Sequence, residues 1–270
     1  MEKGIFYDVK MMARDGIFLK KAVRIALPVA MQGMLNTIVN LVDTMMIGAL
    51  GATAIAAVGL ANKVFFVFTL LVFGIVSGSG VLAAQYWGNG DIKNIKKVVG
   101  LALTLAVAAS IAFLVPAVVC PEAVMRIFTA SEDAIQVGAG YLTIVALSYP
   151  ATAVSNTFVA MLRATGRVKA PVVISSCTIF INIFFNYTFI YGNFGAPAMG
   201  AAGAALATLM ARLAEALSII LVVYLGKAPV AARFKEMFGY SREFLVQFFS
   251  TTSPVIANEF IWGLGTTLYS

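Results

Sequence analysis

The sequence contains no histidine among its 270 residues, and only 11% of its residues are charged. The absence of histidine removes the commonest metal ligand and the usual general base of enzymes. Soluble domains carry about a quarter charged residues, so the low charge also argues against a soluble protein. The two cysteines, Cys120 and Cys177, lie in or near apolar segments and predict small core residues rather than a disulfide framework.

What the sequence has in abundance is apolar residues, which make up 61% of the chain and give a mean hydropathy of +0.93. This composition is typical of an all-α, polytopic membrane protein. Six segments each reach the roughly 20 apolar residues that a membrane helix needs, and a seventh begins near residue 244. The six predicted spans are 22–49, 55–86, 98–119, 135–162, 170–191 and 200–226.

The basic residues outside these spans alternate from loop to loop. From the N-terminal segment, with Arg24 at the start of the first span included, to the linker after the sixth span, the Lys and Arg counts are 6, 0, 3, 1, 3, 0 and 4. Because cytoplasmic loops are enriched in Lys and Arg, this pattern predicts a multi-pass protein of the cytoplasmic membrane with its N-terminus inside. It also accounts for the net charge of +7 without a nucleic-acid partner, and argues against a seven-helix receptor, whose N-terminus lies outside.

The first span carries a polar face that ends in a buried acid. Gln32, Asn36, Asn40 and Asp43 are spaced by 4, 4 and 3 residues, which places all four on one side of a helix. Amides in such positions are explained by hydrogen bonds between helices. A charged Asp at the centre of a membrane helix costs about 2.5–3.5 kcal/mol and indicates a functional site. We therefore predict that Asp43 exchanges a proton or holds Na⁺, and the sequence leaves both open.

Later spans carry further polar residues. Asn182 and Asn186 form an i, i+4 pair in the fifth span, for which functional and packing interpretations are balanced. In the sixth span, Arg212 and Glu215 are spaced to form a structural salt bridge. Glu259 is a second acid within an apolar segment, so it is a second candidate site.

Two features concern the shape of the helices. Pro150, within the fourth span, frees a backbone carbonyl and predicts a kink. Gly74 and Gly78, in the second span, form a small-residue face on which another helix can pack closely.

Residues 244–258 weakly repeat residues 18–32. Phe18, Pro28 and Gln32 correspond to Phe244, Pro254 and Asn258, each at an offset of 226. Internal repeats are common in secondary transporters. We therefore expect an N-terminal six-helix lobe at 1–226 that begins with a cytoplasmic segment at 1–21, a cytoplasmic linker at 227–243, and the start of a second lobe at 244–270. The chain would then be part of a twelve-helix protein.

Several stretches together resemble the multidrug and toxic compound extrusion (MATE) family of transporters. The resemblance covers most of the chain from residue 22 to residue 270. It implies two six-helix lobes related by a pseudo-two-fold axis, and export of organic cations or amphiphilic drugs driven by inward H⁺ or Na⁺. The stretches that carry it are LPVAMQGMLNTIVNLVDTMMIGALG, AAVGLANKVFF, SGVLAAQYWGNGD, YPATAVSNTFVAMLRATGRVKAPVV, NIFFNYTFIYGNFGAPAMGAAGAALAT and PVIANEFIWGLGTTLYS.

The resemblance also implies a cation site. Asp43 matches the acid on the family's first helix, and Asn182 and Asn186 match a polar pair on its fifth helix. Some archaeal and related members have an acid where this chain has Asn186. The difference argues against a purely proton-driven site with two carboxylates.

Further positions follow from the same resemblance. Asn156 and Thr208 match polar positions of the fourth and sixth helices, and Glu259 resembles an acid on the seventh helix of sodium-coupled bacterial members. We expect the first span to bend near Pro28 when Asp43 is neutralised.

The resemblance predicts no cofactor beyond the coupling ion, a lipid bilayer and a drug-like small molecule as partners, and a monomer at full length. The nearest alternative is a flippase for lipid-linked oligosaccharides from the same superfamily, in which more cationic residues would face the central cavity. A membrane-embedded enzyme is disfavoured because the chain has no histidine and no clustered acids.

Overall fold

The computed structural model describes residues 16–269, and this part of the chain is helical without any strand. For residues 16–22, 24, 25, 28, 29, 36, 264 and 266–269 the description is limited to the backbone. The helices are α2 (Gly16–Gly48), α3 (Ala52–Gly88), α4 (Ile92–Val119), α5 (Pro121–Arg126), α6 (Glu132–Ala146), α7 (Tyr149–Ala164), α8 (Lys169–Tyr191), α9 (Ala201–Leu225), α10 (Phe234–Met237) and α11 (Arg242–Tyr269), with a single 3₁₀ turn at Asn193–Gly195.

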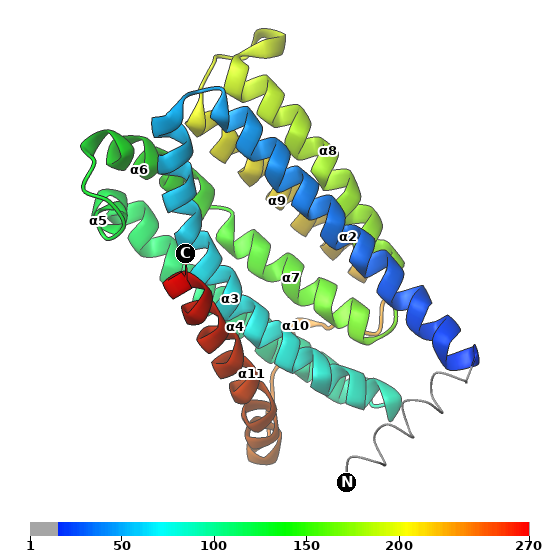
Figure 1. The fold of residues 1–270 in the computed structure, drawn as a ribbon. Coiled ribbons are helices and arrows are strands. Elements are labelled where there is room, and N and C mark those ends of the chain that lie inside the picture. Colours follow the sequence, from blue (N-terminus) through cyan, green and yellow to red (C-terminus); the bar gives the residue numbers. More distant parts are fainter. Residues whose placement is uncertain (1–15, 270) are drawn as a thin grey trace.

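The six predicted spans coincide with α2, α3, α4, the pair α6–α7, α8 and α9, and the seventh segment coincides with α11. By length and composition, α3, α4, α8 and α9 can each cross a membrane, and the bent pair α6–α7 counts as one more span. The predicted all-α membrane fold is therefore confirmed. Figure 1 shows the helices as an elongated bundle, in which α2 and α8 run side by side.

The fourth span is broken where the sequence predicts a kink. Helix α6 ends at Ala146, α7 starts at Tyr149, and the two helices are bent by 48°. Pro150 lies in the first turn of α7, where its missing N–H costs no helical hydrogen bond. The break changes the direction of the span, and α7 packs against α3, α4 and α9.

Local chemistry fixes several helix ends. The Asp91 carboxylate accepts a hydrogen bond from the Asn94 backbone N–H at 3.0 Å and so caps the start of α4. Helix α8 ends at Gly192, whose φ of 75° lies in the left-handed region that favours glycine. The start of α4 and the end of α8 are therefore fixed by local interactions outside their apolar segments.

Helix α3 lies at the centre of the structure. It packs against α4, α6, α7 and α11, and its Phe68 ring stacks on Tyr149 of α7 with centroids 4.7 Å apart. Both aromatic side chains are fully buried. This packing makes α3 the helix against which the other elements are positioned.

The linker between α9 and α11 contains the short helix α10, which packs on α4. The Lys96 ammonium on α4 pairs with the Glu236 carboxylate on α10 at 2.8 Å. The linker therefore contacts the six-helix bundle through a polar contact at the end of α4.

The predicted small-residue face of α3 packs against α11. A Cβ atom added at Gly74 would lie 2.8 Å from the Cα atom of Ile256, and one added at Gly78 would lie 2.7 Å from the Cα atom of Thr252. Both distances are shorter than carbon atoms tolerate, so any larger residue separates the backbones. The prediction of close helix packing is confirmed.

We expect Gly78→Val to weaken the packing of α11 on α3. The added side chain would meet backbone atoms, and overpacking of this kind costs about 1–3 kcal/mol. Thermal unfolding in detergent should show a lower midpoint for this variant. Gly80→Ala is the matched control, because a Cβ atom at Gly80 has no neighbour within 4 Å. Equal midpoints for the two variants would contradict this account of α3.

Candidate functional site

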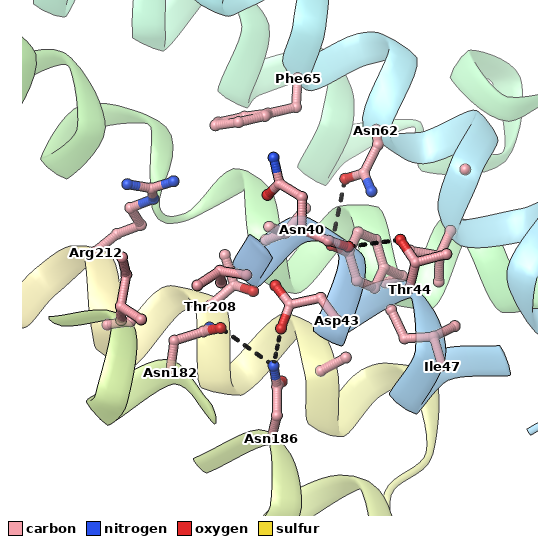
Figure 2. Close-up of a pocket in the computed structure, with 18 of the residues that line it drawn as sticks. Asn40, Asp43, Thr44, Ile47, Asn62, Phe65, Asn182, Asn186, Thr208 and Arg212 are labelled. Carbon is pink, nitrogen blue, oxygen red and sulfur yellow. Dashed lines mark hydrogen bonds between the residues drawn. The ribbon is translucent and has the colours of Figure 1, made fainter. Parts of the chain in front are cut away.

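The candidate site is a cavity of about 550 Å³ enclosed by α2, α3, α6, α8 and α9. It lies toward the ends of α2 and α8 that are joined by short loops to α3 and α9. Its walls combine apolar side chains with a small set of polar ones (Figure 2). Five residues predicted from the sequence line this one cavity, namely Asn40, Asp43, Asn182, Asn186 and Thr208.

Asp43 is held by the amide pair of α8. The Asn186 side-chain nitrogen Nδ2 donates to Asp43 Oδ1 at 2.6 Å and to Asn182 Oδ1 at 3.2 Å. Asn186 is 1% exposed and Asn182 is 7% exposed. The i, i+4 spacing on α8 therefore brings both amides to the carboxylate, and they connect α2 to α8 in the interior of the protein.

The Asn186 side-chain oxygen has a different environment. It is buried and has no hydrogen-bond partner among the described residues. A buried amide oxygen without a donor loses the hydrogen bonds it would make to water, and a bound cation would restore an interaction. The carboxylate of Asp43 and the amide oxygens of α8 together supply the oxygen ligands that hard cations prefer.

A hydroxyl and an amide from other helices complete this end of the cavity. The Tyr141 hydroxyl on α6 donates to Asn62 Oδ1 on α3 at 3.3 Å. On α2, the Thr44 hydroxyl donates to the Asn40 backbone oxygen at 2.7 Å. The sequence analysis did not identify Asn62, Tyr141 or Thr44, because each is a single polar group in an apolar span without the signal that an acid gives.

A charged cluster lies on the opposite wall. Arg212 Nη1 donates to Glu215 Oε2 at 2.9 Å, so the predicted salt bridge is confirmed. The Ser175 hydroxyl on α8 donates to the other carboxylate oxygen of Glu215 at 2.9 Å. Glu215 is 8% exposed, and its two partners satisfy both oxygens. This cluster joins α8 to α9.

A second cavity, of about 1010 Å³, lies between α3, α7 and α11 and also reaches α2, α8 and α9. Gln32, Asn156, Glu259 and Trp262 line it. Arg163 of α7, identified in the sequence only as a basic residue between spans, donates from Nη2 to Gln32 Oε1 at 2.7 Å. The structure therefore does not bring Asn156 or Glu259 into the Asp43 cavity.

The predicted polar face of the first span is divided between the two cavities. Asn40 and Asp43 line the smaller one, and Gln32 lines the larger one. The side chains of Asn36 and Pro28 lie outside the described residues. Helix α2 is consequently attached to the bundle at two levels, by Gln32 at the middle of the helix and by Asp43 near its C-terminal end.

The described residues contain no group of three or more His, Cys, Asp or Glu side chains that could hold a metal ion. The Asp43 cavity is lined by one aspartate, several amides and several hydroxyls in addition to apolar side chains.

Comparisons with known proteins find relatives of this chain. The family model described as MatE matches residues 28–188. Among curated proteins, the chain is 29% identical over 206 residues to the probable multidrug resistance protein NorM of Thermotoga maritima, covering 76% of this chain and 44% of that protein. It is 30% identical over 210 residues to the probable multidrug resistance protein YoeA of Bacillus subtilis, covering 77% and 45%. The chain spans about half the length of these relatives.

Solved structures match over a larger share of the chain. An outward-facing multidrug resistance MATE family transporter of the MOP superfamily superposes with a TM-score of 0.80 at 23% identity, covering 89% of this chain and 52% of that chain. A MOP superfamily transporter from Pyrococcus furiosus gives 0.79 at 23% identity, with 89% and 52% coverage. At this identity the superposition shows the shared fold.

Proposed function

Because this chain belongs to the MATE family, whose members are membrane transporters and not enzymes, we propose that it forms the cation-binding lobe of a drug exporter. The transporter exchanges H⁺ or Na⁺ for organic-cation or amphiphilic drugs across the cytoplasmic membrane, with the N-terminus inside. The observation that carries the proposal is the contact of 2.6 Å between half-buried Asp43 and buried Asn186 in a cavity. The names of the relatives, which are multidrug resistance proteins, support the choice of drugs as substrates.

The proposed mechanism is alternating access. Asp43 takes up a cation from the outside, and its neutralisation weakens the charged contact with Asn186 that attaches α2 to α8. Helix α2 then bends near Pro28, between its cytoplasmic end and the Gln32–Arg163 contact, and drug is released. A membrane potential of 100 mV acting on one charge supplies about 2.3 kcal/mol, a bias of roughly fortyfold to fiftyfold.

The larger cavity supports a drug exporter over a flippase for lipid-linked oligosaccharides. A flippase that handles pyrophosphate would present an excess of cations to its central cavity. Here the charged residues on the wall of the larger cavity are two arginines and two glutamates, namely Arg163, Arg212, Glu215 and Glu259. The described wall therefore carries equal numbers of positive and negative side chains, without the excess of cations that binding of pyrophosphate would need.

The test is transport by proteoliposomes that contain the protein at its natural length. Ethidium efflux is measured with a Na⁺ gradient, with a pH gradient and with neither. We expect one inward cation gradient to stimulate efflux and the other to have little effect, which would also identify the coupling ion. Efflux that is indifferent to both gradients would exclude the proposed antiport.

A further inference from the structure

The charged cluster of Arg212, Glu215 and Ser175 stands between the two cavities. Four residues line both the Asp43 cavity and the larger cavity. Three of these four residues form the charged cluster. The fourth shared residue is Thr69 of α3. The cluster is therefore a common wall between the proposed ion site and the larger cavity.

Arg212 is positioned to act on the ion site from this wall. It lines the same cavity as Asp43 (Figure 2), and its charge interacts with that carboxylate. Its side chain is 40% exposed, whereas that of its partner Glu215 is 10% exposed. Arg212 is therefore the more exposed member of the cluster. It is bound by Glu215, which is itself held by the Ser175 hydroxyl.

The charges around Asp43 can be counted from the walls of its cavity. Helix α9 contributes Arg212 and Glu215, and helix α6 contributes Tyr141, which is neutral at ordinary pH. The lining residues from α3 and α8 are apolar, amide or hydroxyl side chains. Asp43, Glu215 and Arg212 together give the described cavity a net charge of −1, with Arg212 as its one cation.

We propose that Arg212 is a resident cation that limits the affinity of the Asp43 site for its coupling ion, and that Glu215 and Ser175 hold it in place. The inference rests on the proposed function and adds a residue that sets the ion affinity. A coupling ion that binds too tightly is not released inside the cell, so an exporter needs an affinity that is limited. A fixed positive charge in the same cavity lowers that affinity without occupying the ion site.

A charge series tests this inference. The readout is the half-saturating concentration of whichever cation, H⁺ or Na⁺, drives ethidium efflux by the natural-length protein. Because Arg212 and Glu215 line the same cavity as Asp43, removing one unit charge should change ion affinity by about tenfold at an effective dielectric constant of about 20. We therefore expect Arg212→Gln to lower the half-saturating concentration by about tenfold, and Glu215→Gln to raise it by about tenfold.

Two further variants separate charge from structure. Arg212→Lys keeps the positive charge with fewer hydrogen bonds, so its half-saturating concentration should stay within about twofold of the wild type. The double variant Arg212→Gln with Glu215→Gln restores the net charge and leaves no unpaired buried charge, which protects folding. The half-saturating cation concentration of the double variant should lie between those of the two single Gln variants. We expect it to stay within about threefold of the wild-type value.

Each outcome bears on the proposal. The proposal is supported if ion affinity is highest in Arg212→Gln, lowest in Glu215→Gln, and intermediate in the wild type, Arg212→Lys and the double variant. If Arg212→Lys and Arg212→Gln change the half-saturating concentration equally, or if Glu215→Gln and the double variant agree, Arg212 is structural and the inference is wrong. Should Arg212→Gln not fold, the comparison of Glu215→Gln with the double variant still decides. If Asp43→Asn transports like the wild type, the proposed function itself fails, which is a distinct result.

Discussion

Asp43→Asn should abolish the stimulation of drug efflux by a cation gradient. The substitution keeps the size of the side chain and its ability to accept a hydrogen bond from Asn186, which Asp43 accepts at 2.6 Å. It removes the negative charge that the coupling cation neutralises. The driving bias of roughly fortyfold to fiftyfold per 100 mV on the coupling cation is then lost, because no coupling cation moves inward with the transport cycle. Efflux with the gradient should fall to the rate measured without it.

Drug binding separates this result from general damage. The larger cavity, which we propose holds the drug, does not include Asp43 among its lining residues. Ethidium binding by the Asp43→Asn protein should therefore stay within a few-fold of the wild type. Thr37→Val is the matched control on α2, because the Thr37 hydroxyl bonds to the Gly33 backbone oxygen and Thr37 lines neither cavity. Gradient-stimulated efflux that survives in Asp43→Asn would remove the acid from the mechanism.

Asn186→Leu should also cause a large change in ion coupling. The change removes the donor to Asp43 and the buried side-chain oxygen that has no partner among the described residues. The donor stabilises the charged form of Asp43 by about 1.5–3 kcal/mol, a factor of roughly ten to a hundred. If H⁺ drives efflux, loss of the donor should therefore lower the half-saturating H⁺ concentration by about that factor in the transport assay. If Na⁺ drives efflux, loss of the buried amide oxygen removes a ligand, and the half-saturating Na⁺ concentration should rise.

Two further variants on α8 distinguish the loss of an ion ligand from a disturbance of helix packing. Asn186→Asp keeps oxygen ligands at this position, so it should retain more Na⁺ affinity than Asn186→Leu. Thr188→Val tests packing on the same helix, because the buried Thr188 hydroxyl bonds to the Phe184 backbone oxygen and does not line the Asp43 cavity. If Thr188→Val changes coupling as strongly as Asn186→Leu, the effect belongs to the packing of α8 and not to an ion ligand.

Much of the fold could be predicted from the sequence, because a membrane leaves few alternatives. A spanning segment must satisfy its backbone internally, so each long apolar run becomes a helix. The kink in the fourth span also followed from one residue, Pro150, which the structure places in the first turn of α7. The helices α5 and α10 were not predicted, since six-residue and four-residue segments carry no periodic signal.

The candidate site could be predicted in part. The i, i+4 spacing of Asn182 and Asn186 identified a shared face, and the acid of the first span identified the cavity onto which that face opens. Asn156 was grouped with them through the resemblance to the MATE family, but it lines the larger cavity. The 48° bend between α6 and α7 sets the direction of its helix, and the angle of a bend is not encoded in residue spacing.

The salt bridge of α9 illustrates a similar limit. The spacing of Arg212 and Glu215 predicted the pair, which the structure confirms. Spacing within one helix contains no information about what lies on either side of it. Only the packing of α8 and α9 places the pair on the wall shared by two cavities.

The central claim, that a cation moving through the Asp43 site drives drug export, is tested most directly by measuring both fluxes in the same vesicles. Proteoliposomes holding the natural-length protein are given an inward gradient of the driving cation, and cation uptake and ethidium efflux are recorded together. The account predicts cation uptake that starts when drug is added, rises with drug efflux in constant proportion and is absent from Asp43→Asn vesicles. Drug efflux without any accompanying cation uptake, or equal cation uptake in wild-type and Asp43→Asn vesicles, would contradict it.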